Sequence, residues 1–147
     1  MPVTVEKPSL SVGTKRHTRC IMCGDFNQLS LGLKFSPSET GDVSASFQGN
    51  SLLQGYDGIL HGGVISALLD CAMTHCLFHR NIEAVTGELL VRFAVPVPYD
   101  AKVTLRAWLV NSTAPLYLLK AELALDGTVM ASADAKFMQR GYGSGLQ

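Results

Sequence analysis

The sequence has no excess of either charge, few cysteines and no long apolar run. Its 147 residues hold 12 Lys and Arg against 12 Asp and Glu, so the net charge is zero at neutral pH. Proteins that bind nucleic acid by neutralising phosphates need an excess of positive charge, and this class is therefore excluded. No stretch approaches the roughly 18–20 apolar residues of a membrane-spanning helix. With 47% hydrophobic residues the chain is too apolar to be disordered, so we expect a globular protein.

The N-terminal residues lack the features of a secretory signal. Residues 1–20 contain no apolar stretch of about 7–15 residues. We therefore expect a cytoplasmic protein whose four cysteines are thiols rather than disulfides. Residues 1–18 mix Pro, Ser, Thr and Gly with basic residues and predict a loosely ordered extension, and the glycine-rich residues 141–147 predict a flexible tail. Residues 19–140 are expected to form a single domain.

Alternating apolar and polar residues predict a largely antiparallel β domain. Two short strands are expected over residues 31–35 and 43–47, joined by a turn. After residue 83 the alternation predicts four longer strands, over residues 85–95, 103–109, 117–125 and 129–137. The Asp126-Gly127 pair between the last two runs is a strong hairpin signal.

One segment, from Gly63 to Phe78, predicts a long helix. Apolar residues lie on nearly every side of it, so we expect the helix to be buried all round. Two strands, one helix and four strands predict an α+β fold in which a curved antiparallel sheet wraps a single helix. The outer face of that sheet is too apolar to be fully solvated, so this face or the sheet edge is expected to contact another subunit. The apolar residues of the outer face are Leu90, Ala94, Trp108, Leu116 and Leu118.

The predicted helix starts with His61, Gly62 and Gly63. Helix N-termini carry unpaired N–H groups and positive partial charge, and glycines let a ligand approach them without a Cβ in the way. Such groups suit a carbonyl oxygen or a developing oxyanion. The alternative is a glycine turn that enters a helix capped by His61.

Asp70 lies in the most apolar part of the chain. A carboxylate there is costly unless it is paired or faces a cavity, so Asp70 is either a functional or a hydrogen-bonded structural residue. Gly63 and Asp70 are seven residues apart, which places them within ~20° on one helix face, together with Ser66 and Thr74, but about 10.5 Å apart along the axis. Reacting groups must meet within ~3–3.5 Å. The spacing therefore favours a site shared between two chains with antiparallel helices.

Three runs together resemble the hotdog-fold thioesterases of the PaaI type, in the 4-hydroxybenzoyl-CoA thioesterase superfamily. They are CIMCGDFNQLSLGLKF, GYDGILHGGVISALLDCAM and AVTGELLVRFAVPVP, and the resemblance covers about residues 20–138. It implies a hotdog fold, with a homodimer formed through a continued sheet and dimers often paired into homotetramers. It also implies hydrolysis of an acyl-CoA substrate at the subunit interface, and we expect no cofactor and no bound metal.

By position, the resemblance implies a role for each motif residue. The amide of Gly62, with Gly63 nearby, would polarise the thioester carbonyl, and His61 would orient the thioester or the loop. Asp70 would act from the partner chain as base or nucleophile. Thr86 falls where relatives often place a hydroxyl that holds the water or the carboxylate.

Two positions depart from the pattern of the family. Gly55 stands where several relatives carry a substrate-orienting Asn, and Cys71 stands where many carry a second acidic residue. Asp57 is a candidate to compensate, although a loop Asp is usually a turn residue. The departures leave a non-hydrolytic acyl-CoA-binding or regulatory protein as the alternative. Further substrate-binding candidates are Tyr56, Ser66 and Phe93, and, for the phosphates of CoA, Arg92 and Lys136.

Two pairs, Cys20 with Cys23 and His75 with His79, have the residue types of a zinc site. The separation of Cys23 from His75 far exceeds the roughly 12–15 residues of a compact finger, so the spacing disfavours zinc. A redox role for the cysteine pair lacks the βαβ context of a thioredoxin-like site. Cys71 is expected to pack as a small apolar residue.

Overall fold

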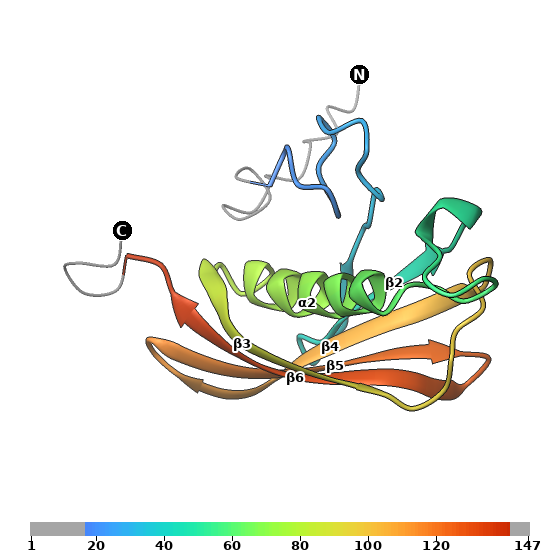
Figure 1. The fold of residues 1–147 in the computed structure, drawn as a ribbon. Coiled ribbons are helices and arrows are strands. Elements are labelled where there is room, and N and C mark those ends of the chain that lie inside the picture. Colours follow the sequence, from blue (N-terminus) through green and yellow to red (C-terminus); the bar gives the residue numbers. More distant parts are fainter. Residues whose placement is uncertain (1–16, 142–147) are drawn as a thin grey trace, which may run out of the picture.

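A six-stranded antiparallel sheet curves around one long helix in the computed structural model, which describes residues 17–141 (Figure 1). In chain order the elements are β1 (Ser36–Pro37), β2 (Val43–Gln48), the 3-10 helix η1 (Ser51–Leu53), α2 (Gly62–Phe78), β3 (Ala84–Phe93), β4 (Lys102–Thr113), β5 (Leu116–Leu125) and β6 (Thr128–Gln139). The order across the sheet is β1-β2-β4-β5-β6-β3. The expected α+β class is confirmed. The predicted extension, residues 1–18, and tail, residues 141–147, lie almost wholly outside the described residues.

The core lies between the concave face of the sheet and α2. Successive side chains of a strand point to opposite faces, so every second residue of β2, of β5 and of the first half of β4 is buried in the core. The predicted hairpin at Asp126 and Gly127 joins β5 to β6, and both residues have the positive φ that a tight two-residue turn requires. The most buried residues of α2, none more than 1% exposed, are Leu68, Leu69, Ala72, Met73, Cys76 and Leu77.

The segment before β1 covers the side of α2 that faces away from the sheet (Figure 1). The strand predicted over residues 31–35 is wrong, because only Ser36 and Pro37 pair with β2. Leu31 and Leu33 instead donate their N–H groups to the carbonyls of Ile21 and Met22, at 2.8 and 3.0 Å. The alternating apolar residues of this segment are thus explained by packing on the helix, and not by a place in the sheet.

The expectation that α2 is buried all round is wrong for one stripe of the helix. Gly63 is exposed, and Ser66, Asp70 and Thr74 are half-buried. These residues recur every three or four positions, so they share the one side that neither the sheet nor the N-terminal segment covers. No helix within residues 17–141 combines the length and apolar character needed to cross a membrane.

Candidate active site

The N-terminus of α2 leaves backbone N–H groups unpaired. His61 precedes the helix with an extended backbone, and its Nδ1 accepts a hydrogen bond from the N–H of Gly63 at 2.8 Å. His61 therefore caps the helix, as one of the two interpretations of the sequence predicted, and this hydrogen bond occupies the N–H of Gly63. The N–H groups of Gly62 and Val64 have no partner in the described part of the chain. Of the two glycines predicted to bind an oxyanion, Gly62 is the one whose N–H remains available.

Two cavities meet at His61. The smaller, of about 460 Å³, lies over the loop before the helix and is lined by Gly55, Tyr56 and Gly62 among others. The larger, of about 790 Å³, lies between η1, the first turn of α2 and the N-terminal segment. Its walls are mainly apolar, with side chains that the motif analysis did not single out: Ile21, Met22, Leu29, Leu31, Leu52, Leu53, Val64 and Ala67. An acyl chain or another apolar group fits such a lining.

The absence of a side chain at Gly55 has a structural reason. A Cβ at this position would lie 3.3 Å from both the Cα and the Cδ2 of His61. This is tighter than an ordinary contact, so the ring of His61 would have to move. Gly55 therefore lets the His61 side chain close onto Gly63.

Phe93, at the end of β3, forms a wall beside Gly62. A Cβ on Gly62 would lie 3.5 Å from the ring of Phe93, and the ring itself is half exposed. The structure thus places this predicted substrate-binding residue at the start of the helix. Because Gly62 has no side chain, a ligand can reach its N–H group beside the ring of Phe93.

The carboxylate of Asp70 is held by a hydroxyl group from β3. Thr86 Oγ1 donates a hydrogen bond to Asp70 Oδ1 at 2.5 Å, and within residues 17–141 this carboxylate has no second hydrogen-bond partner. The strand register shifts between Thr86 and Glu88, which leaves Gly87 as a bulge. A bulge reverses which side chains face inward. Without it Thr86 would lie on the face opposite to Leu89, away from the helix, so the contact with Asp70 depends on the bulge.

The other two polar residues of the exposed stripe bond to the helix itself. Ser66 Oγ donates to the carbonyl of Gly62, and Thr74 Oγ1 donates to the carbonyl of Asp70, each at 2.9 Å. Such bonds to the preceding turn are common for hydroxyl side chains in helices. Both hydroxyl groups therefore donate within the helix. The Asp70 carboxylate, bonded only through Oδ1 among the described residues, is the acceptor on this stripe that can still take a further hydrogen bond.

The remaining sequence candidates lie away from the helix start or on loops. Arg92 donates to Asp134 at 2.7 Å, and Lys136 lies 3.6 Å from Glu88, both on the sheet face opposite to α2. The hydrogen bond from Arg92 holds the pKa of the Asp134 carboxyl below its usual value. Tyr56 is exposed and lines the smaller cavity. Asp57 lies in an exposed turn beside it.

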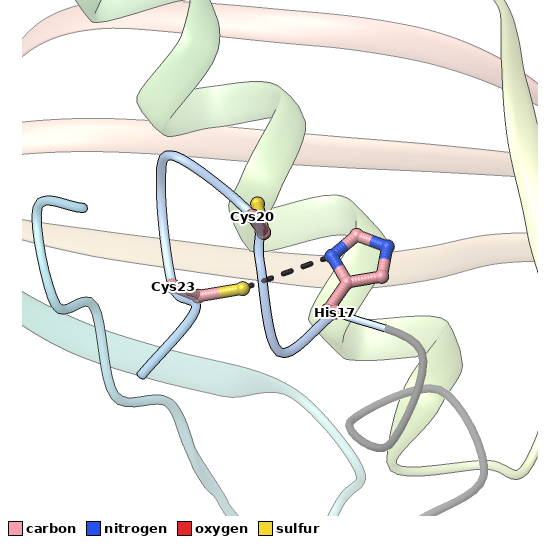
Figure 2. A group of neighbouring side chains, drawn as sticks. All are labelled: His17, Cys20 and Cys23. Carbon is pink, nitrogen blue, oxygen red and sulfur yellow. Dashed lines mark hydrogen bonds between the residues drawn. The ribbon is translucent and has the colours of Figure 1, made fainter. Parts of the chain in front are cut away.

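A second group of chemistry-bearing side chains lies between α2 and the segment before β1 (Figure 2). His17, Cys20 and Cys23 come together there, and Cys23 also lies next to Cys71 and His75 of the helix. Sequence spacing had paired His75 with His79, but His79 caps the helix and is not part of the group. The signal that would have found it is the combination of His17-x2-Cys20-x2-Cys23 with Cys71-x3-His75.

Sequence comparison identifies the relatives of the central region. Residues 57–114 match the family model described as the thioesterase superfamily. The acyl-coenzyme A thioesterase THEM4 of Bos taurus is 35% identical over 63 residues, which make up 43% of this chain and 25% of the relative. The chain therefore aligns with about a quarter of that curated relative.

Solved structures share the fold. A crystal structure described as a thioesterase superfamily protein has a TM-score of 0.79 at 22% identity, covering 94% of this chain and 72% of that one. A mutant of the phenylacetic acid degradation protein PaaI from Thermus thermophilus has a TM-score of 0.67 at 24% identity, covering 74% and 93%. The hotdog fold expected from the sequence is confirmed by these structures, and residues 57–114 are similar to the thioesterase superfamily.

Proposed function

We propose that this protein is an acyl-CoA thioesterase whose site is shared by two copies of the chain. The observation that carries the proposal is the exposed stripe of α2. It presents the unpaired N–H of Gly62 at one end and the Asp70 carboxylate, held by Thr86, further along. An N–H donor and a carboxylate are the two groups that attack on a thioester needs.

The spacing of these groups supports a shared site. Seven helical residues separate Gly63 from Asp70, about 10.5 Å along the axis, so one chain does not bring both to one carbonyl. Two α2 helices running antiparallel would place the Gly62 N–H of one chain near Asp70 of the other. The half-exposed stripe is the surface through which they would meet.

The edge of the sheet supports the same arrangement. Among residues 17–141, β3 is an edge strand of ten residues that pairs only with β6, and long apolar edges are rare in proteins that stay monomeric. Val85, Leu90 and Phe93 on this strand are each about half exposed, at 51%, 49% and 55%. Pairing of β3 with β3 of a second copy would extend the sheet and bring the two helices side by side. Two such dimers, associated through the outer faces of their sheets, would give the tetramer that the resemblance implies.

In the proposed reaction, the thioester carbonyl oxygen accepts a hydrogen bond from the N–H of Gly62. The ring of Phe93 orients the acyl group. Asp70 either takes a proton from a water molecule that attacks the carbonyl carbon, or attacks that carbon itself to form an anhydride that water then opens. In both routes the C–S bond breaks, water supplies the OH that completes hydrolysis to the carboxylic acid, and its other proton passes to the leaving sulfur, which departs as the CoA thiol. The N–H of Gly62 stabilises the negative charge that builds up on oxygen.

The first test measures thiol release from short, long and aromatic acyl-CoAs by the wild type and by Asp70→Asn. We expect the variant to lose about 100-fold or more of kcat, the usual share of general acid–base catalysis, with an unchanged circular dichroism spectrum. Asp126→Asn is the matched control, because Asp126 lies in the β5–β6 turn with a positive φ that Asn also tolerates. Full activity of Asp70→Asn would remove this residue from the mechanism.

Mixing two inactive variants tests whether the site is shared. When Asp70→Asn and Gly62→Pro chains are mixed in equal amounts and allowed to exchange, half of the dimers contain both. Each mixed dimer has one intact site, so about a quarter of wild-type activity returns in a symmetric dimer. A site built within one chain would regain nothing.

The alternative function is acyl-CoA binding without turnover. It is favoured by Gly55, because the position that carries a substrate-orienting amide in several relatives has no side chain here. Titration of a non-hydrolysable acyl-CoA analogue, followed by calorimetry, would then give binding while the wild type releases no thiol from any substrate of the panel.

A further inference from the structure

Five potential metal ligands meet where the N-terminal segment crosses α2. The ligand atoms of His17, Cys20 and Cys23 lie within 4.8 Å of one another, and so do those of Cys23, Cys71 and His75. Cys23 belongs to both groups, with its Sγ directed at the Nδ1 of His17, 3.7 Å away (Figure 2). Three residues come from one tight turn and two from successive turns of the helix.

The turn around the two cysteines is closed by a backbone hydrogen bond and directs one backbone N–H at a cysteine sulfur. The N–H of Met22 points at the sulfur of Cys20, at 3.3 Å, and the N–H of Gly24 donates to the carbonyl of Cys20 at 2.8 Å. A Cβ at Gly24 would collide with the backbone nitrogen of Cys20, so only glycine fits after Cys23. Backbone N–H groups aimed at sulfur stabilise a thiolate and orient it as a ligand.

The helix side of the group contains an unexplained polar atom. His75 is only 8% exposed, and its Nε2 is buried without a hydrogen-bond partner among the described residues. Burying a polar atom without a partner is unfavourable, so a ligand or ion at this position is expected. The ring is held in place by stacking on Phe35, at 4.7 Å between centroids, and by the edge contact with Phe78.

Cys23 lies at the centre of the group. The ligand atoms of His17 and Cys20 lie within 4.8 Å of its sulfur in one set, and those of Cys71 and His75 lie within 4.8 Å of it in the other. A metal bound at this sulfur would therefore have four further potential ligands within reach, and the cysteines among them would lose their protons on binding.

We infer that this group binds one zinc ion, which joins the N-terminal segment to α2 through Cys23 and three of His17, Cys20, Cys71 and His75. Two or three cysteine sulfurs completed by imidazole nitrogen form the donor sets that zinc prefers in closed, tetrahedral sites. A small cavity of about 230 Å³, lined by His17, Cys23 and His75, opens beside the group and offers an approach path for the ion. The site is independent of the proposed reaction, since Asp70 lies on another side of the helix.

The ion would also fix one wall of the larger cavity. Ile21 and Met22 lie between the two cysteines of the turn, and both line that cavity. Loss of the metal is therefore expected to loosen residues 17–26 first, which hydrogen exchange of the backbone amides would detect.

The first experiment measures metal content. The full chain is produced in zinc-containing medium, purified without chelators or nickel resin, and analysed by mass spectrometry of the elements. We expect about one zinc per chain in the wild type and in Cys76→Ser. Cys76 is the matched control, a buried cysteine of the same helix whose sulfur lies near the carbonyl of Gly41 instead. Cys23→Ser is expected to lose the zinc.

The second experiment keeps the inference testable if Cys23→Ser does not fold. Metal-free wild type is titrated with Co²⁺ alone and then with Zn²⁺. The expected result is the near-ultraviolet thiolate-to-cobalt band and the intense visible bands of tetrahedral cobalt, both removed by zinc. His17→Ala and His75→Ala, measured in the same way, identify which nitrogen binds.

Three results would overturn the inference. The first is wild type that contains no zinc and gives no cobalt spectrum. The second is a disulfide between cysteines of the group in protein purified under reducing conditions. The third is Cys23→Ser that folds and binds zinc as the wild type does.

Discussion

Replacing Gly62 by proline removes a single N–H group from the proposed site. Gly62 is the first residue of α2, where proline is favoured, and its N–H has no partner in the described chain. His61 before it has φ −60° and ψ 133°, the extended conformation that a residue preceding proline prefers. Since proline also restricts the unfolded chain, we expect stability to be unchanged or to rise by about 0.4–1 kcal/mol.

The expected loss of activity follows from the role of that N–H. Removing one oxyanion donor costs about 10²–10³ in kcat, or about 2.7–4 kcal/mol of transition-state stabilisation. Gly62→Ala is the control, because it keeps the N–H and its Cβ meets Phe93 at an ordinary 3.5 Å. We expect Gly62→Ala to retain turnover within a few-fold.

The assay is thiol release under saturating acyl-CoA, with urea unfolding of each variant. If Gly62→Pro and Gly62→Ala have the same kcat, the N–H of Gly62 does not stabilise the oxyanion and the reasoning is refuted. If both are inactive but folded, the defect is steric and Phe93 must be examined as the cause.

Three further predictions concern the surrounding structure. Thr86→Val removes the only hydrogen bond to the Asp70 carboxylate within residues 17–141 and should lower kcat about 10-fold, with rescue by Thr86→Ser; an unchanged kcat would show that this contact is not used. Leu68→Ala, at a fully buried position, should lower the free energy of unfolding by about 2–5 kcal/mol in urea titrations; a loss below about 1 kcal/mol would contradict the packing described for α2. Arg92→Gln should cost at most about 1 kcal/mol at pH 7, because its ion pair with Asp134 is partly exposed. As the pKa of Asp134 is lowered in the folded state, this contribution is present above the unfolded value of about 3.9 and is lost as pH falls through the folded value, so variant and wild type should converge under acid.

Local sequence patterns were sufficient to predict those strands and that helix whose residues follow such patterns. The alternation after residue 83 predicted β3 to β6 to within a few residues, and the Asp126-Gly127 pair predicted their last hairpin. The helix and its His-Gly-Gly start were likewise visible, because a long apolar run and the glycines before it are properties of neighbouring residues. Where alternation had a different cause, as in Leu31 and Leu33, the same rule gave a strand that does not exist.

Contacts between distant segments were not visible in this way. Thr86 faces Asp70 because of the bulge at Gly87, and the alternation of apolar residues in β3 does not predict this bulge. Cys23 approaches Cys71 and His75 only because the N-terminal segment folds over α2, so the separation along the chain that disfavoured a zinc site does not measure the distance in space. The sequence alone determined the type and order of β2, of α2 and of β3 to β6, since these depend on local propensity and burial pattern. Only the tertiary structure decided which side chains meet, because that depends on register, on a bulge and on the path of a segment without regular structure.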